Sequence, residues 1–204
     1  MLIKPRSLRR GFTLIELMVT IVLVGILLVM AIPAFGRWIA DAHVRAAAES
    51  LVNAIRVSQA TAVARGRTSM FALTVDTPPV YRSPAQENAP NWYAALNPLS
   101  GSDETGTTLG LILKSTEGTQ HAVAISGPAL TCFNAMGRQV SLAATATSLS
   151  SACTAPSDDV TSPTTYRVSR KDASRSFNVL VYLGGRVRMC DAAKTLSGTD
   201  PDGC

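Results

Sequence analysis

The sequence is poor in aromatic and charged residues, and it lacks the short motifs that mark common enzyme classes. Aromatic side chains make up 5% and charged side chains 16% of the 204 residues, so the core must be built mainly from aliphatic side chains. There is no HExxH zinc motif, no GxSxG nucleophile elbow, no Walker loop and no dinucleotide fingerprint. The two histidines, His43 and His121, complete no triad and show no metal-ligand spacing with the cysteines. We therefore predict no catalysis, no cofactor and no metal site.

The positive net charge of the chain comes mostly from basic residues near its N-terminus. The formal net charge is +5, with 19 basic and 14 acidic side chains. Four of the basic residues, Lys4, Arg6, Arg9 and Arg10, precede Gly11. Without them the balance is 15 basic against 14 acidic side chains, or +1. Any interaction with nucleic acid must therefore depend on a local patch rather than on bulk charge.

Charge is also nearly absent from residues 12–35, which contain one ionisable side chain, Glu16. About 20 apolar residues in a helix can span a bilayer, and the preceding basic residues favour a cytoplasmic N-terminus. A cleaved secretory signal would be shorter, and Ile32 fits poorly before a cleavage site at Ala34. A plain membrane anchor explains the length but leaves Glu16 unexplained. A carboxylate costs about 2.5–3.5 kcal/mol at the centre of a spanning helix, so it is a functional candidate.

Cysteine is absent before Cys132, and no pair forms a CxxC motif. The four cysteines are Cys132, Cys153, Cys190 and Cys204. Beside an export segment, two disulfides are the natural interpretation. Four cysteines permit three connectivities, of which we predict pairing between sequence neighbours, Cys132 with Cys153 and Cys190 with Cys204. Free buried thiols are the alternative.

The residues at the start of the apolar run form a specific pattern. Residues 10–19 read Arg-Gly-Phe-Thr-Leu-Ile-Glu-Leu-Met-Val, which resembles the class III signal of type IV prepilins and type II secretion pseudopilins. The resemblance implies that a prepilin peptidase cleaves after Gly11 on the cytoplasmic side and that the new terminus, Phe12, is N-methylated. It also implies that Glu16 meets the terminal amine of a neighbouring subunit during assembly. An amine and a carboxylate in a low-dielectric environment satisfy each other far better than either does alone.

The remaining sequence predicts an α+β, pilin-like domain. Apolar residues recur at three- and four-residue spacing through residues 38–65, which predicts an amphipathic continuation of the helix, and Gly66 is a plausible C-cap. The expected division is a leader at 1–11, a transmembrane and assembly helix at 12–36, its amphipathic continuation at 37–66, and a periplasmic β-rich domain at 67–204. The helix should pack on a mostly antiparallel sheet.

Strand signals are spread over the C-terminal two thirds of the chain. They fall at 69–75, 109–113, 121–125, 129–133, 138–142, 165–169, 177–183 and 186–190. Residues 82–108 contain several prolines and glycines and are expected to form a long loop, with a short ordered piece around Trp92 and Tyr93. Residues 143–163 are expected to be a surface excursion that Cys153 ties down. Gly184 and Gly185 predict a two-residue hairpin turn.

Three segments resemble the GspH/FimT group of pseudopilins, namely residues 64–66, 133–138 and 185–188. The last segment, Gly-Arg-Val-Arg, resembles the GRxR motif of FimT proteins that bind DNA. Arg186 and Arg188 should project from one face of a strand and could grip successive phosphates. Arg170 and Lys171 are the other candidate DNA-binding residues. The alternatives are a solvated hairpin edge or a contact with a neighbouring pilin, and the acidic tail after Cys190 is able to neutralise the patch.

These observations lead to three hypotheses about function. The first is a GspH/FimT-like minor pilin, a structural subunit in type IV pilus assembly. The second is a pseudopilin of a type II secretion system, and the third is a pilus-associated DNA receptor for natural transformation. The implied partners are other pilin subunits, a prepilin peptidase, the bacterial inner membrane and, for the third hypothesis, DNA. We expect a single-pass inner-membrane protein that later enters a pilus or pseudopilus.

Overall fold

The computed structural model describes residues 12–98, 110–115, 123–147, 151–158 and 162–204. The side chains of residues 30–34 and 146 lie outside this description. So do the predicted leader with Gly11, His121, and parts of the segments expected at 82–108, 109–113, 121–125 and 143–163. The chain divides into two compact units, Met1–Trp38 and Ile39–Cys204, and each unit is described by itself.

Helix α1 spans Leu14–Arg65, as the apolar run and the amphipathic pattern predict. It ends at Gly66, whose φ is +60°, and the N–H of Arg67 donates to the carbonyl of Ala62 at 3.0 Å. This is the left-handed glycine cap that the sequence predicts. In the second unit, the helix buries one stripe of side chains. Its members are Ala40, Val44, Ala48, Leu51, Val52, Ala54, Ile55 and Ala62.

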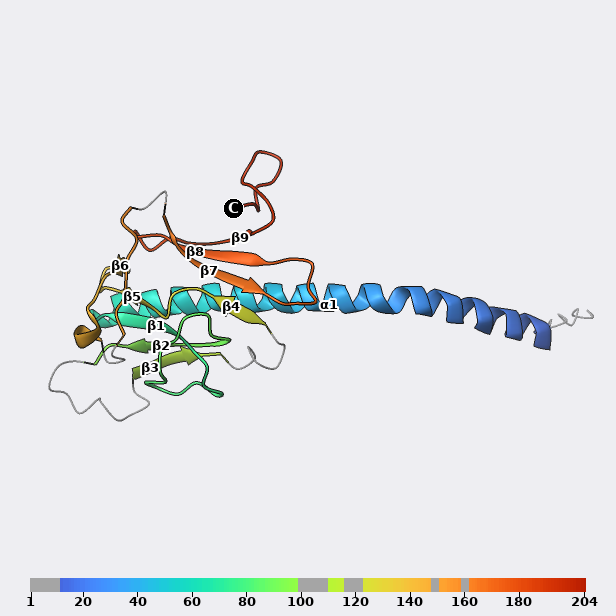
Figure 1. The fold of residues 1–204 in the computed structure, drawn as a ribbon, viewed down its shortest axis with the longest axis horizontal. Coiled ribbons are helices and arrows are strands. Elements are labelled where there is room, and N and C mark those ends of the chain that lie inside the picture. The colour runs from blue at the N-terminus through green and yellow to red at the C-terminus, as the bar shows by residue number, and fades with distance from the viewer. Residues whose placement is uncertain (1–11, 99–109, 116–122, 148–150, 159–161) are drawn as a thin grey trace, which may run out of the picture. The chain divides into compact units, whose positions relative to one another are not determined.

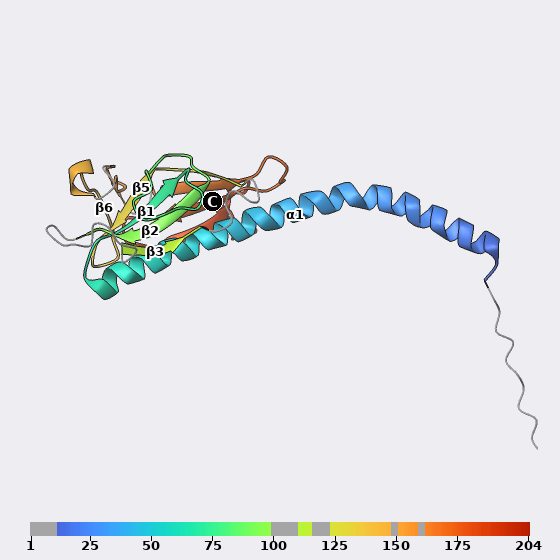
Figure 2. The same ribbon diagram turned by 90° about the horizontal axis from the view of Figure 1, so that it is seen from below.

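The second unit contains two antiparallel sheets rather than the single sheet that was expected. The first has the order β3-β2-β1-β5-β6 and the second the order β4-β7-β8-β9. The strands are β1 (Ser69–Thr74), β2 (Asn91–Leu96), β3 (Leu111–Lys114), β4 (Ala124–Ser126), β5 (Leu130–Phe133), β6 (Gln139–Val140), β7 (Thr164–Ser169), β8 (Phe177–Val181) and β9 (Val187–Asp191). Figure 1 shows both sheets beside the C-terminal part of α1, and Figure 2 shows the strands gathered on one side of that part.

The main core lies between α1 and the two sheets. Phe71 of β1 packs against Trp92 of β2 and against Tyr166 of β7, with ring centroids 5.8 and 5.5 Å apart. The hydroxyl of Tyr166 is hydrogen-bonded to that of Thr131 in β5, so one buried tyrosine joins the sheets.

A second, smaller core covers the other face of the five-stranded sheet. It contains Met70, Ala72, Tyr93, Ala95, Leu130, Cys132 and Cys153. Every residue of β1 and β2 is consequently buried. The short ordered piece expected around Trp92 and Tyr93 is strand β2, which takes up six residues of the segment otherwise expected to be a loop. A strand buried on both faces reads as a short continuous apolar run, and the prolines at 90 and 98 that suggested a loop flank this strand.

Candidate functional site

Glu16 lies in the first turn of α1, four residues after Phe12, the predicted new terminus. Thr13 precedes the helix, and its hydroxyl accepts a hydrogen bond from the backbone N–H of Glu16 at 3.3 Å. A threonine followed three residues later by a glutamate is the sequence of a capping box. A carboxylate in the first helical turn also interacts favourably with the helix dipole. Glu16 therefore has a local reason to occupy this position, in addition to any role in assembly.

The helical surface that follows is apolar all round and exposed. Phe12 is 81% exposed and Leu14 74%, and the large apolar side chains from Ile15 to Val29 are all at least half exposed. Monomeric soluble proteins rarely expose contiguous apolar patches of this extent, and a helix that is apolar on every side is normally buried. The apolar side chains of this segment therefore need an apolar environment that the described residues do not provide. Among the described residues, no helix is both long and apolar enough to cross a membrane.

Two hairpin turns that the sequence singled out meet at one side chain of α1. The Nε2 of Gln59 donates to the carbonyl of Gly185 at 2.7 Å and to that of Gly137 at 3.3 Å. Gly185 has a φ of +93°, and a Cβ on it would lie 2.4 Å from the carbonyl oxygen of Gly137. The segments at 133–138 and 185–188 are thus packed against each other on the helix. No pattern in the sequence indicated this role of Gln59.

The β8–β9 hairpin differs in one detail from its prediction. The N–H of Tyr182 donates to the carbonyl of Arg186 at 2.9 Å, and the N–H of Gly185 donates to the carbonyl of Tyr182 at 2.9 Å. Three residues, 183–185, therefore form the loop, with the left-handed glycine at its end. The predicted two-residue turn is wrong, because Leu183 also lies outside the strand pairing. Three-residue hairpin loops of this kind commonly close with a left-handed glycine.

The two arginines of this hairpin that were predicted to bind DNA, Arg186 and Arg188, have different surroundings in the structure. Arg186 is exposed, and its guanidinium carbon lies 4.0 Å from the centroid of the Tyr182 ring. Arg188 lies in β9, where its Nη2 donates to the carbonyls of Gly203 at 2.7 Å and Pro201 at 3.2 Å. These bonds hold the C-terminal tail against β9. The guanidinium of Arg188 is therefore largely committed to the fold, whereas that of Arg186 is accessible.

The other two candidates lie in the β7–β8 loop, residues 170–176, close to the start of the second unit. The guanidinium of Arg170 binds Asp172 through two hydrogen bonds, at 2.6 and 2.9 Å, and its Nη1 lies 3.1 Å from Nδ1 of His43. The hydrogen bonds from Arg170 hold the pKa of the Asp172 carboxyl below its ordinary value. Lys171 is exposed. The structure thus places Arg170 and Lys171 in a different hairpin from Arg186 and Arg188.

Asp41 of α1 binds the same loop through a contact that no sequence pattern indicated. Its carboxylate accepts hydrogen bonds from the Ser174 N–H at 2.7 Å, the Ser174 hydroxyl at 2.6 Å and the Arg175 N–H at 3.0 Å. Desolvation raises the pKa of this carboxyl, but these hydrogen bonds outweigh it and hold the pKa below its ordinary value. The contact joins residues 133 and 134 positions apart, which no local pattern reveals.

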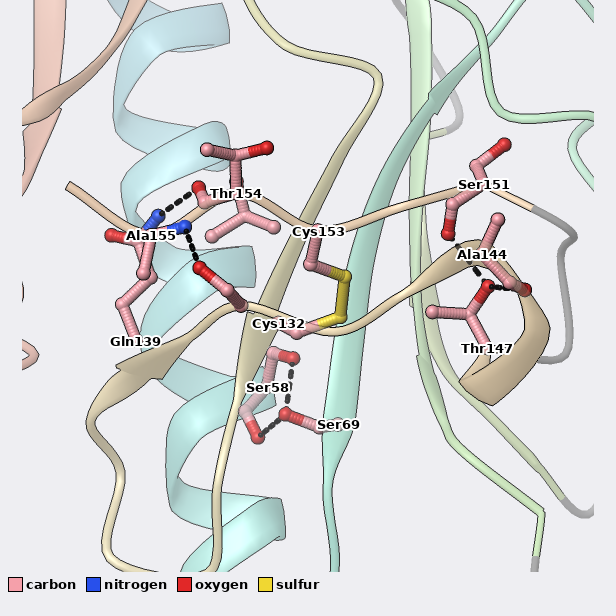
Figure 3. Close-up of a disulfide and its surroundings, with 12 residues drawn as sticks. Ser58, Ser69, Cys132, Gln139, Ala144, Thr147, Ser151, Cys153, Thr154 and Ala155 are labelled. Carbon is pink, nitrogen blue, oxygen red and sulfur yellow. Dashed lines mark hydrogen bonds between the residues drawn. A yellow bond between two sulfur atoms is a disulfide. The ribbon is translucent and has the colours of Figure 1, made fainter.

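Both predicted disulfides are present. Cys132 is bonded to Cys153 and Cys190 to Cys204, with Cα atoms 5.8 and 5.2 Å apart. Figure 3 shows the first bridge between β5 and the returning end of the Ala-, Ser- and Thr-rich excursion. There the backbones of Cys153 and Leu142 exchange hydrogen bonds of 2.9 and 3.0 Å. The bridge therefore closes the excursion over the smaller core, as the sequence predicted for Cys153.

The second disulfide ties down the acidic tail. The N–H of Asp191 donates to the carbonyl of Asp202 at 2.7 Å. Lys194 forms salt bridges with Asp200 at 3.2 Å and Asp202 at 3.0 Å. Two of the three tail carboxylates thus pair with the tail's own lysine, and Asp191 is buried. These two acids therefore form their salt bridges with Lys194, and not with Arg186 or Arg188 as the predicted neutralisation of the patch required.

Comparison with known proteins identifies the N-terminal segment. The profile of the prokaryotic N-terminal methylation motif matches residues 6–32, which include Gly11, Phe12 and Glu16. Two crystal structures of the type IV minor pilin FimU from Pseudomonas aeruginosa are similar, at 13% and 14% sequence identity and a TM-score of 0.45 each. The alignments cover 74% of this chain and 94% and 91% of the FimU chains. No match was found among curated protein sequences.

Proposed function

We propose that this chain, a type IV pilin-like protein, works as a minor pilin, a structural subunit in the assembly of a type IV pilus. One observation carries the proposal. A helical segment with exposed apolar side chains on every side begins with Glu16 in its first turn, inside a methylation motif. Such a helix needs either lipid or other apolar helices around it. A subunit that moves from a membrane into a filament meets both environments in turn.

Processing and anchoring follow from the same segment. In this proposal a prepilin peptidase cleaves after Gly11, Phe12 becomes the N-methylated terminus, and the apolar helix stays in the bacterial inner membrane. The β-rich unit then lies on the far side of the membrane from the leader, where its two disulfides form. The domain boundaries at residues 11, 36 and 66 are part of this proposal.

Assembly would pair Glu16 with the terminal amine of a neighbouring subunit. Leaving a charge unpaired in an apolar environment costs several kcal/mol, and an ion pair with good geometry removes most of this cost. The pairing therefore favours one axial register between adjacent helices. The capping bond from Glu16 N–H to Thr13 keeps the carboxylate in the first helical turn, close to its own terminus.

A pseudopilin of a type II secretion system would use the same helix in the same way. The GspH/FimT features are shared by both kinds of subunit, so the N-terminal chemistry does not separate them. Purification of the chain from its own cells, with identification of the bound subunits by mass spectrometry, distinguishes the two. Pilus subunits in the complex would support the minor pilin, and secretion pseudopilins would support the alternative.

The accessible guanidinium of Arg186 favours a second candidate function, DNA binding at the pilus. Arginine binds phosphate through two parallel hydrogen bonds, and stacking on Tyr182 restricts the side chain without using its N–H groups. A single subunit would engage few phosphates, so its affinity would be low and strongly salt-dependent.

Substituting the two hairpin arginines one at a time should distinguish an effect on DNA binding from an effect on the stability of the fold. For the full chain in detergent, Arg186→Ala should weaken binding to duplex DNA several-fold and lower the salt slope by about one, the change expected for one lost phosphate contact. Arg188→Ala should instead lower the midpoint of thermal unfolding, because its bonds hold the tail. Gel shifts at several salt concentrations and thermal melts measure both effects.

Arg45→Ala is the matched control, since Arg45 is an exposed arginine that pairs with Glu49 on the helix. It should change neither DNA binding nor stability appreciably. DNA binding that is unchanged in the Arg186→Ala, Arg188→Ala double variant would rule out this hairpin as a DNA site.

A further inference from the structure

The β7–β8 loop, residues 170–176, is held against α1 at the very start of the second unit. Asp41 accepts three hydrogen bonds from Ser174 and Arg175, and Arg170 reaches His43. Both helical partners lie within the first five residues of this unit. The position of the loop along the helix is therefore fixed by contacts with two helical residues, Asp41 and His43, and not by the loop alone.

This attachment keeps the loop near the membrane if residues 12–36 span it. Asp41 follows residue 36 by only five positions, and five residues reach at most about 18 Å even when fully extended. The polar headgroup layer on each side of a bilayer is roughly 5–8 Å thick. The chain itself therefore keeps a loop bound to Asp41 within reach of the headgroups, on the side where the spanning segment leaves the membrane.

The composition of the loop suits a polar, anionic layer. It reads Arg-Lys-Asp-Ala-Ser-Arg-Ser and contains no large apolar side chain. Arg170 is paired with Asp172, and the Asp41 carboxylate is occupied by hydrogen-bond donors of the loop. Lys171 and Arg175 remain exposed, and neither side chain forms a salt bridge within the described ranges of the chain. The charge of Arg175 is partly offset by electrostatic interaction with Asp41 and Asp202.

We propose that Lys171 and Arg175 bind anionic phospholipid headgroups while the subunit is anchored in the membrane before assembly. The inference rests on the proposed function, because it requires residues 12–36 to lie in the bilayer. Basic side chains near an anionic membrane surface each contribute a favourable interaction that falls off within a Debye length. The contact fixes the β-rich unit close to the bilayer, and extraction of the helix into a filament breaks it.

Chemical protection of Lys171 tests this proposal in the full chain. The protein is reconstituted into vesicles of phosphatidylcholine, with or without phosphatidylglycerol, and treated with a membrane-impermeant reagent that acetylates amines. Mass spectrometry then gives the labelling rate of Lys171 relative to that of Lys114 in β3. Because both lysines belong to the same unit, their ratio is independent of the orientation of the chain in the vesicle.

The ratio should fall by about fivefold when phosphatidylglycerol is present, which is the effect expected for one basic residue at an anionic surface. High salt should restore it. Arg175→Gln should weaken the protection of Lys171, because it removes the second cation of the loop. Arg138→Gln, which changes an arginine in the β5–β6 turn near the other end of the helix, should leave the protection unchanged.

Flotation of the vesicles in the same samples tests the membrane anchor separately from the headgroup contact. A chain that floats with the vesicles, and whose Lys171 is labelled equally in both lipids, would overturn the headgroup contact and leave the membrane anchor intact. A chain that does not float would overturn the anchor as well as the contact. Protection of Lys171 by added duplex DNA, with none from phosphatidylglycerol, would replace the lipid partner by nucleic acid.

Discussion

Replacing Glu16 with Gln should leave the precursor processed normally but reduce its incorporation into filaments by about tenfold or more. Removing one partner of an ion pair in an apolar bundle leaves the neighbour's terminal amine unpaired, at a cost of several kcal/mol. The substitution keeps the size of the side chain, and glutamine also suits the third position of a capping box. A loss of incorporation therefore reports the charge of Glu16 rather than a frayed helix. Immunoblots of membrane and sheared filament fractions measure the ratio.

Two further variants make this experiment specific. Glu16→Ala should reduce incorporation at least as strongly as Glu16→Gln. Glu49→Gln, which removes an exposed carboxylate paired with Arg45 on the same helix, should be incorporated as well as the unchanged chain. Incorporation of Glu16→Gln at the normal level would show that the carboxylate plays no part in assembly.

Replacing Gly185 with Ala should destabilise the β-rich unit by about 3 kcal/mol. A left-handed conformation costs a non-glycine residue about 1–3 kcal/mol, and a Cβ at 2.4 Å from the Gly137 carbonyl oxygen forces the two turns apart. Their separation also disturbs the hydrogen bonds from Gln59 to both carbonyls. The midpoint of thermal unfolding should fall by roughly 6–12 °C, on the usual scaling for domains of this size.

Gly198→Ala is the matched control. Gly198 lies in the C-terminal tail, and a Cβ added there meets no atom within 4 Å, so its effect on the unfolding midpoint should be close to zero. Equal midpoints for the two alanine variants would contradict the packing of the β8–β9 turn on the β5–β6 turn. The comparison also separates the structural need for Gly185 from any role of the neighbouring Arg186 in binding.

The strongest patterns in the sequence predicted the parts of the structure that depend on local chemistry. The 3.6-residue periodicity placed the buried stripe of α1, Gly66 marked its end, and the spacing of the cysteines suggested the correct disulfide pairing. The predicted α+β class is also correct. Each of these features depends on residues close together in the sequence or on a regular repeat.

The features that the sequence did not reveal depend on contacts between distant segments. The division into two sheets follows from how Tyr166 and Phe71 share the core, which no local pattern encodes. An ordered piece was expected around Trp92 and Tyr93, but its identity as the six-residue strand β2 was not, because a strand buried on both faces lacks alternation. The contacts of Gln59 with two glycine turns, of Asp41 with the β7–β8 loop, and of Arg188 with the tail are of the same long-range kind.

The candidate site residues also divide into those that a local motif reveals and those whose state depends on contacts with distant segments. Glu16 and Phe12 were found from a compact motif, and the structure adds the capping bond to Thr13. The four basic candidates looked equivalent in the sequence, because the sequence does not show which side chains are exposed or which partners they bind. The structure shows that Arg170 and Arg188 are engaged by Asp172 and by tail carbonyls. Arg186 and Lys171 remain the two accessible cations of that set.

The mass of the N-terminal peptide of the mature protein tests the central claim most directly. The chain should be purified from the membranes or filaments of its own cells, digested and measured by tandem mass spectrometry. The account predicts a peptide that begins at Phe12, lacks residues 1–11 and carries one added methyl group on its terminal amine. A mature chain that still contains the residues before Phe12, or one that begins after Ala34 and has lost the apolar helix, would contradict it.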